Sequence, residues 1–121
     1  MKKFTVETDF GTYEDVILTT GRYPVRLPGN FYNPIYISMD SKEEGLLAVL
    51  TVNVGLPGMI DDSYTAIDTN NCPFAEAFLL ENGIGKKTGR TVRSGYCEYP
   101  IYEINKELLK EIAANEGEPA V

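Results

Sequence analysis

The chain of 121 residues contains no histidine and no tryptophan, and it has only two cysteines. The absence of histidine removes the commonest general base and the commonest metal ligand together. Cys72 and Cys97 lie too far apart in sequence for a CxxC pair, and two sulfurs alone do not complete a zinc site. We therefore expect no metal and no cofactor, and thiols that stay reduced.

Long apolar runs are also missing. No stretch approaches the roughly 20 residues that a membrane-spanning helix needs. The first residues, MKKFTVETDF, turn polar too early for a secretory signal. These absences predict a cytoplasmic protein that does not enter a membrane.

Positive charge is scarce, because 11 Lys and Arg residues face 18 Asp and Glu residues, and the net charge is −7. This balance argues against a general affinity for nucleic acid, since phosphate binding depends on Lys and Arg. Two interpretations of the acidity stay open. It can serve solubility alone, or it can imitate nucleic acid toward a basic partner protein.

The length fits one domain, and 43% hydrophobic residues suffice for a core. The first half alternates apolar and polar residues, as in Phe4, Val6 and Thr8, which predicts strands with one buried face. The apolar run GLLAVLTVNV at 45–54 ends in β-branched residues and predicts a central strand. The order of elements predicts one α+β domain over residues 1–114, with a mostly antiparallel sheet. Residues 115–121 are expected to form a flexible acidic tail.

Two helices, at about 72–82 and 105–114, are expected to pack on this sheet. Asn71 or Cys72 is expected to cap the first helix, with Pro73 in its first turn. Gly83 is suited to end that helix in a left-handed conformation. Asn105 is expected to cap the second. The predicted buried residues are Phe74, Ala77, Phe78, Leu79 and Leu80 in the first helix and Leu108, Leu109 and Ile112 in the second.

Two segments imitate ligand-binding loops and fail on spacing. Residues 83–90, GIGKKTGR, follow a helix, whereas a phosphate loop leads from a strand into one. Gly83, Gly85 and Gly89 are expected instead to supply positive φ angles for a helix end and a turn. Residues 68–71, DTNN, open like a calcium loop, but the later glycine and glutamate of that loop are missing. Structural roles in turns and capping are therefore expected for the polar residues Asp68, Asn70 and Asn71.

Four positive charges, on Lys86, Lys87, Arg90 and Arg93, fall within eight residues. With the aromatic rings of Tyr96 and Tyr99 they form a candidate binding surface for phosphate or an acidic partner. The favoured interpretation is a solvated turn and edge strand, where Lys and Arg prevent edge-to-edge aggregation. Cys72, at an expected helix start, is a candidate nucleophile without a histidine partner, so a small buried residue is the favoured role.

Several short motifs in order resemble a known family. They are DTNNCPFAE at 68–76, ENGIG at 81–85, TGR at 88–90, SGY at 94–96 and YPIY at 99–102, with LTVNV at 50–54. Together they resemble a small bacterial family of unknown function over roughly the second two-thirds of the chain. The resemblance implies carriage on conjugative transposons and other mobile elements, and it implies no activity or catalytic residues.

The acidity, the absent catalytic set and the resemblance predict a non-enzymatic module that binds another protein. The expected role is inhibition of a host defence nuclease, of the antirestriction or anti-CRISPR type, with Glu107 and Glu111 contributing to a basic partner's binding. The alternative is a nucleic-acid or phosphate-binding accessory protein that uses residues 86–93. An enzyme that uses Cys72 or Asp68 is the least favoured hypothesis.

Overall fold

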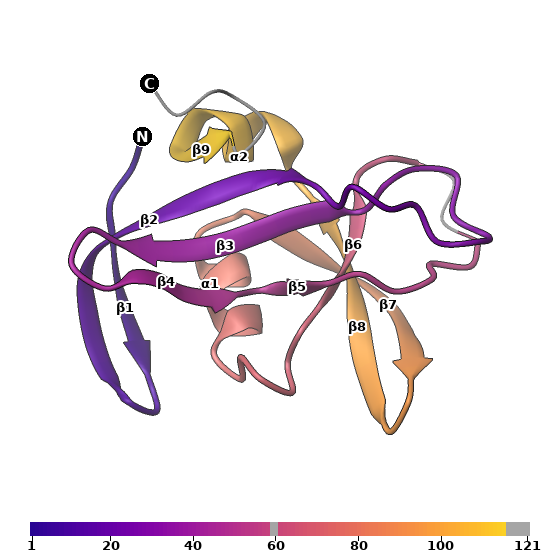
Figure 1. Cartoon of the computed structure of the whole chain (residues 1–121), viewed down its shortest axis with the longest axis horizontal. Coiled ribbons are helices and arrows are strands. Elements are labelled where there is room, and N and C mark those ends of the chain that lie inside the picture. The colour runs from indigo at the N-terminus through magenta and orange to yellow at the C-terminus, as the bar shows by residue number, and fades with distance from the viewer. Residues whose placement is uncertain (59–60, 116–121) are drawn as a thin grey trace.

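The computed structural model describes residues 1–58 and 61–115, and in them the chain forms two sheets and two short helices (Figure 1). The predicted α+β class with mostly antiparallel strands is confirmed. In chain order the elements are β1 Phe4–Thr8, β2 Gly11–Arg22, β3 Ile35–Ser41, β4 Gly45–Val49, β5 Thr51–Val52, β6 Tyr64–Ile67, α1 Ala75–Glu81, β7 Gly85–Ser94, β8 Cys97–Ile104, α2 Lys106–Ile112 and β9 Ala113–Asn115.

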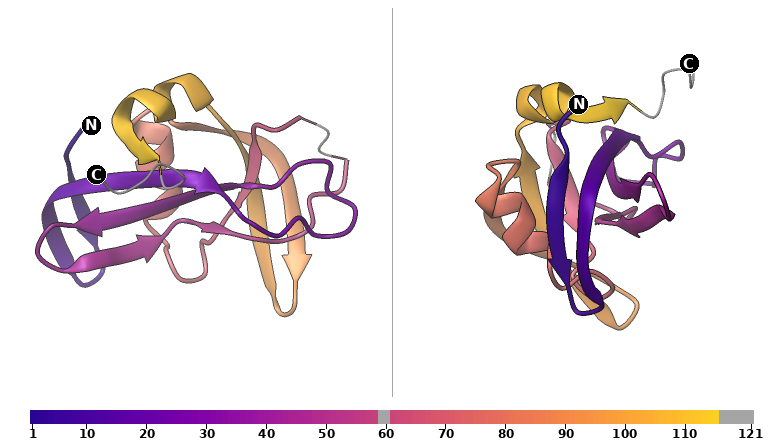
Figure 2. Two further views of the ribbon diagram at one scale, coloured as in Figure 1. Left: turned by 45° about the horizontal axis from the view of Figure 1, so that its top comes forward. Right: turned by 90° about the vertical axis from the view of Figure 1, so that its left-hand side faces the viewer.

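The first sheet has the order β1-β2-β3-β4, and β2 is the strand that organises it. The first half of β2 pairs with β1, and its second half pairs with β3 and with β9. The β1–β2 register shifts between Phe4 and Val6, and Asp15 opposite this shift has a φ of 55°. Such a bulge bends a strand. The β1–β2 hairpin therefore turns away from the rest of the sheet (Figure 2).

The second sheet has the order β5-β6-β8-β7, with antiparallel pairs throughout. The apolar run 45–54 contributes an edge strand to each sheet, so the prediction of one central strand is wrong. The break falls at Leu50, whose N–H donates to Ile37 O at 2.9 Å. The carbonyl of Leu50 accepts from Asp68 N at 2.8 Å. Leu50 thus bonds to both sheets, and the chain crosses from one to the other there.

The main core lies between the sheets and is closed by both helices. Phe4 of β1 meets Phe78 of α1 edge to face, with ring centroids 5.2 Å apart. Tyr102 of β8 is fully buried in the same cluster. A smaller apolar cluster on the other face of the second sheet contains Ala66 and Ile101. Both faces of β8 are therefore covered.

Helix α1 begins at Ala75, and its N-cap position is Phe74, which makes no side-chain cap. The predicted cap at Asn71 or Cys72 is wrong, and Pro73 precedes the helix. The cause is Asp68, whose carboxylate accepts from Asn71 N at 3.1 Å and whose carbonyl accepts from Cys72 N at 2.8 Å. These bonds hold the two residues in a separate turn before the helix.

The later start also turns the buried face of α1. Ala75, Phe78 and Leu79 are buried, whereas Ala77 and Leu80 are exposed, which corrects the predicted apolar face. Positions 75, 78 and 79 share one side because a helix repeats every 3.6 residues. The helix ends as its sequence indicates, with Gly83 at a φ of 68°.

Helix α2 starts at its predicted cap, since the Asn105 side chain accepts from Leu108 N at 3.1 Å. Leu109 and Ile112 are buried and Leu108 is half-buried. The helix stops at Ile112, so the prediction of helix to residue 114 is wrong. Residues 113–115 form β9, parallel to β2, because the edge of β2 beyond β1 offers free backbone groups. Of the predicted tail, Asn115 belongs to this strand, and residues 116–121 lie outside the described residues.

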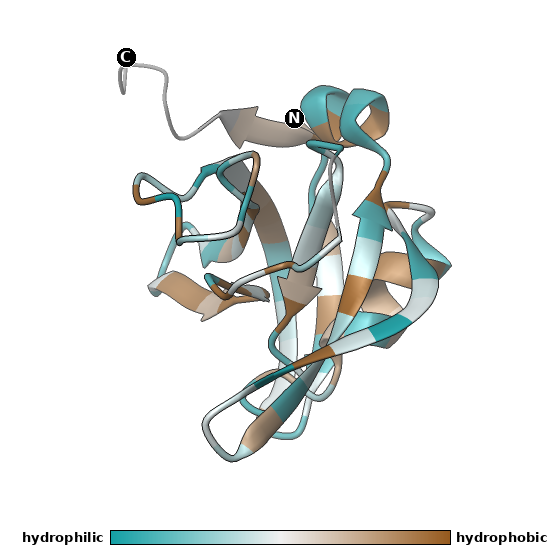
Figure 3. Cartoon of the chain, turned by 90° about the vertical axis from the view of Figure 1, so that its right-hand side faces the viewer, coloured by the Kyte–Doolittle hydropathy of each residue, from teal (hydrophilic) through white to brown (hydrophobic). Residues whose placement is uncertain are grey.

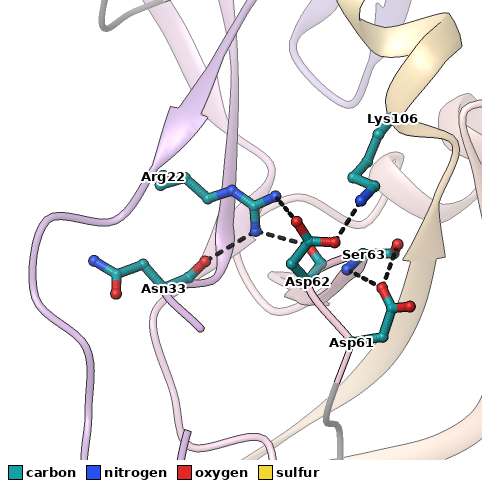
Figure 4. A network of polar contacts seen from close by, with 6 residues as sticks. All are labelled: Arg22, Asn33, Asp61, Asp62, Ser63 and Lys106. Atoms are coloured by element: carbon teal, nitrogen blue, oxygen red, sulfur yellow. Dashed lines mark hydrogen bonds and ion pairs between the residues drawn. The ribbon is translucent and has the colours of Figure 1, made fainter. Parts of the chain in front are cut away.

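A polar network fixes the start of α2 against the end of β2 (Figure 4). Arg22 donates to the carbonyl of Asp62 at 2.6 Å and to its carboxylate at 3.3 Å. Lys106 bonds the other carboxylate oxygen of Asp62. Next to it, Asp61 accepts from both the N–H and the hydroxyl of Ser63, and these bonds lower the pKa of Asp61.

Candidate functional site

The four basic candidate residues, Lys86, Lys87, Arg90 and Arg93, lie along β7, the outer strand of the second sheet, and not in a glycine-rich turn. A register shift between Lys87 and Thr91 accommodates Gly89, whose φ is 81°. Gly85 has no positive φ, so the turn role predicted for it is wrong. It leaves space for Tyr102 instead, since an added Cβ would lie 3.0 Å from Cδ2 of that ring.

Three of these four cations already have partners. Lys86 Nζ lies 3.5 Å from Glu103 Oε1, and Lys87 Nζ lies 3.8 Å from Glu76 Oε2. Arg90 donates to the carbonyl of Pro57 at 3.0 Å. A phosphate group would have to compete with these contacts. The arrangement matches the solvated edge strand better than an anion site.

The two tyrosines predicted beside this strand are in different environments. Tyr96 occupies the tip of the β7–β8 hairpin and is fully exposed. Tyr99 is half-buried and packs against the smaller apolar cluster. A hydrogen bond with the side chain of Cys97, followed by burial, raises the pKa of Tyr99. Figure 3 shows this hairpin with hydrophilic and hydrophobic bands along both strands. Of these two tyrosines, Tyr96 has its ring free for stacking on a partner.

The segment 68–74 is held by its own polar groups. Asp68 accepts from the backbone N–H of Asn71 at 3.1 Å and from its side-chain amide at 2.9 Å. Asn70 is exposed in the same turn. These contacts are the Asx-turn arrangement that the sequence indicates for Asp68 and Asn71.

Cys72 is buried, and its thiol donates to the carbonyl of Val49 at 3.3 Å. Burial, followed by the nearby carboxylate of Asp68, raises the pKa of Cys72 above its ordinary value of 9.0. A nucleophilic cysteine needs the opposite shift, toward the thiolate at neutral pH. The geometry thus fits a small buried residue that fastens the segment to β4.

A cavity of about 320 Å³ lies between the β1–β2 hairpin, β3, β4 and the segment 68–74. Its wall is largely apolar and includes Val6, Met39, Leu47 and Phe74. Asp68 is the acidic residue on that wall, and no lysine or arginine among the described residues lines it. A concave apolar site with a few polar groups is the usual form of a ligand site.

Two hairpin tips and the segment 68–74 project from one side of the molecule, opposite α2 (Figures 1 and 2). Phe10, at the tip between β1 and β2, is 91% exposed, and Tyr96, at the other tip, is fully exposed. Large aromatic side chains gain free energy when they leave water. We call this side of the molecule, with Phe10, Tyr96 and residues 68–74, the tip face.

Charge is separated along the long axis of the molecule. The stretches 7–15 and 40–44 contain seven acidic residues and one lysine, and the pairing of β2 with β3 brings them together. Residues 86–93 of β7 contain four basic residues and no acidic one. The β1–β2 and β7–β8 hairpins stand at opposite ends in Figure 1. The acidic end of the molecule therefore lies at the β1–β2 hairpin. The positive charge lies along β7, where Glu98 and Glu103 of the paired strand β8 partly offset it.

The family model for the domain of unknown function DUF4313 matches residues 30–118. The chain belongs to this family. The DUF4313 match contains the segment 68–102 that carries most of the resemblance seen in the sequence, and it starts after the β1–β2 hairpin. No curated protein and no solved structure matches the chain.

The part of the chain that the structure describes contains neither a cluster of metal ligands nor a membrane-spanning helix. Across residues 1–58 and 61–115, no three Cys, Asp or Glu side chains converge to hold a metal ion. Neither described helix is long and apolar enough to cross a membrane.

Sequence reasoning missed Phe10 and the cavity. The turn Asp9-Phe10-Gly11 carries a signal for Phe10, because a large aromatic residue at a hairpin tip has no strand face to bury it. The cavity has no sequence signal, since its wall comes from segments as distant as Val6 and Phe74.

Proposed function

We propose that this chain is a non-enzymatic module that binds another protein through its tip face. The observation that carries the proposal is the exposure of Phe10 and Tyr96, two aromatic residues on separate hairpins that project from the same side. Aromatic residues are enriched where interfaces are most buried, and a few such residues supply most of the binding energy.

The charge distribution supports a basic partner for the end that carries Phe10. Acidic residues of two hairpins surround it, and complementary charge steers association and sets orientation. A groove that binds nucleic acid is a basic surface of this kind. The acidity would then act as an imitation of nucleic acid, in addition to any effect on solubility.

The family resemblance narrows the partner further. It implies carriage on conjugative transposons and other mobile elements, whose small acidic proteins often protect the element from host defence. We therefore propose a host defence nuclease, of the restriction or CRISPR type, as the target of inhibition. This step rests on context and size, because a fold alone does not specify function.

The test is a pull-down and inhibition screen against restriction and CRISPR nucleases. Phe10→Ser and the charge reversal Glu7→Lys with Glu14→Lys are expected to weaken the bound complex, and the effect of the reversal should shrink as salt rises. The sequence alone suggested that Glu107 and Glu111 contribute to binding. Because α2 lies opposite the tip face, the reversal Glu107→Lys with Glu111→Lys becomes the matched control. The proposal fails if no nuclease binds, or if the α2 reversal has the larger effect.

Nucleic-acid binding through β7 is the alternative that the same protein can test directly. Lys86, Lys87 and Arg90 are already engaged with protein groups, which weakens this alternative. The test is titration with single- and double-stranded oligonucleotides at low salt, where the electrostatic attraction to phosphates is strongest. Binding there that is lost in Lys86→Glu with Arg93→Glu would replace the protein-binding proposal.

A further inference from the structure

The cavity behind the β1–β2 hairpin has the dimensions of a small-molecule site. Its volume of about 320 Å³ lies within the range of roughly 300–1,000 Å³ that such sites occupy. Val6, Met39 and Cys72 form part of its wall and are 4%, 1% and 4% exposed. These side chains also belong to the main core. This part of the wall is thus fixed by the packing of the domain, and a ligand would not have to order it. Phe10, at the exposed hairpin tip, also lines the cavity.

The polar side of the cavity is negative. Asp68 lines this side, and the backbone and side-chain amides of Asn71 hold its carboxylate at 3.1 and 2.9 Å. A carboxylate offers about four lone-pair positions, so these two bonds leave acceptor capacity for a ligand. The thiol of Cys72 is turned to the carbonyl of Val49 and does not offset the charge. The pKa of Cys72 is raised by burial of its thiol and then by the nearby charge of Asp68.

The surroundings favour a cation as well. Glu7 and Asp9 stand on the hairpin that forms one wall, within the acidic end of the molecule. Charges of one sign around a cleft raise the local concentration of ligands of the opposite sign.

We propose that this cavity binds a small amphipathic cation, with an apolar body against Val6, Leu47 and Phe74 and an ammonium-type head paired with Asp68. The apolar wall selects the body by burying its surface. The single carboxylate selects the head, because an anionic head would be placed against Asp68 and a neutral head would gain no ion pair. The cavity shares Phe10 and the segment 68–74 with the tip face. Ligand binding is nevertheless measured on this chain alone, so the failure of either proposal leaves the other standing.

The experiment compares three probes of equal chain length, octylammonium, octanol and octanoate, by calorimetric titration at low salt. Cys97→Ser serves as the background, so that Cys72 is the one remaining thiol. Octylammonium is expected to bind about tenfold more tightly than octanoate. It should also slow the alkylation of Cys72 by iodoacetamide, which places the ligand in the cavity.

Two variants distinguish the contribution of the charged head of the ligand from that of its apolar body. Asp68→Asn keeps an oxygen for the Asn71 N–H and should bring the affinities of the cation and the anion to within about twofold. The matched control Glu107→Gln removes the same charge from α2, which does not line the cavity, and should keep the preference. Ala48→Leu fills the cavity and should abolish binding of all three probes.

Thermal unfolding of each variant shows whether it is folded. If Asp68→Asn does not fold, the preference among the three probes and the effect of Ala48→Leu still decide the matter. Equal affinity for the three probes, no binding by any of them, or binding that survives Ala48→Leu and leaves Cys72 alkylation unchanged would each overturn the proposal.

Discussion

The hydroxyl of Tyr102 donates a 2.6 Å hydrogen bond to Oε2 of Glu76. Tyr102 comes from β8 and is fully buried, whereas Glu76 stands in the first turn of α1. The same carboxylate oxygen lies 3.8 Å from Nζ of Lys87 on β7. One carboxylate therefore connects the helix to both strands of the β7–β8 hairpin.

Removal of this hydroxyl tests the connection. Tyr102→Phe keeps the ring in the core and loses the bond, and we expect the free energy of unfolding to fall by about 1–2 kcal/mol. Glu76 is partly exposed and can regain water, which holds the loss below that of a fully buried pair. Urea unfolding measures the change. Tyr96→Phe removes an exposed hydroxyl and serves as the control, and equal effects of the two variants would refute the assignment.

We expect the protein to lose stability at alkaline pH because of the Tyr102 hydroxyl. Burial, followed by Glu76, raises the pKa of Tyr102 well above its ordinary value of 10.0. Above pH 10 the unfolded chain releases this proton while the folded chain retains it, so the free energy of unfolding falls as pH rises. Urea unfolding between pH 8 and pH 11 should show a steeper decline for the wild type than for Tyr102→Phe. Parallel curves would contradict this origin of the pH dependence.

Gly85 should not tolerate a methyl group. In Gly85→Ala the new Cβ would stand 3.0 Å from Cδ2 of Tyr102 and 3.4 Å from Cδ1 of Ile104, both in the core. Overpacking of this kind costs about 1–3 kcal/mol. Gly55→Ala is the matched control, because a Cβ there meets no atom within 4 Å. Denaturant midpoints that shift equally in the two variants would show that close packing at Gly85 is not the cause.

Asp62 should stabilise the docking of α2 on the sheets. It accepts from Arg22 of β2 and from Lys106 of α2, and the bond with Lys106 raises the pKa of that lysine. Asp62→Asn is expected to speed amide hydrogen exchange in α2 and β9 more than the surface variant Glu107→Gln does. Both partners are partly exposed, so the difference should shrink in 1 M salt, where the screening length is about 3 Å. Unchanged exchange in α2 would assign its docking to Leu109 and Ile112 alone.

The features that were read correctly from the sequence are local ones. The alternation of Phe4 and Val6 gives β1 its buried face, Asn105 caps α2, and Gly83 ends α1. Each depends on a few neighbouring residues whose backbone angles or hydrogen bonds are decided within one or two turns. Such preferences depend on residues that are close in sequence, so they act in the same way whatever the rest of the fold is.

The errors occurred where distant segments compete for the same backbone groups. Residues 45–54 read as one strand, but Leu50 donates to Ile37 and accepts from Asp68, which divides the run between two sheets. Ala113 and Ala114 have the composition of a helix end, yet the open edge of β2 draws them into β9. The cap of α1 moved because Asp68 had already engaged Asn71 and Cys72.

The candidate sites divide in the same way. Most of the candidate residues fall in 68–99, and the structure separates the segment 68–74, below α1, from the β7–β8 hairpin (Figure 1). Asp68 and Cys72 join the cavity with Val6 and Leu47, which are remote in sequence. Lys86 and Lys87 form surface ion pairs with Glu103 and Glu76, and both lysine side chains stay largely exposed.

The sequence by itself determined the α+β class, the positions of most turns, the acidity and the family of this protein, because these follow from composition and from contacts between near neighbours. The tertiary structure alone decided which strands lie at an edge, which charges are already paired, that Phe10 and Tyr96 share one face, and that a cavity opens beside Asp68. Each of these depends on segments that meet only when the chain is folded. The free energy of burying apolar surface depends on the area that leaves water and not on how far apart the residues are in the sequence.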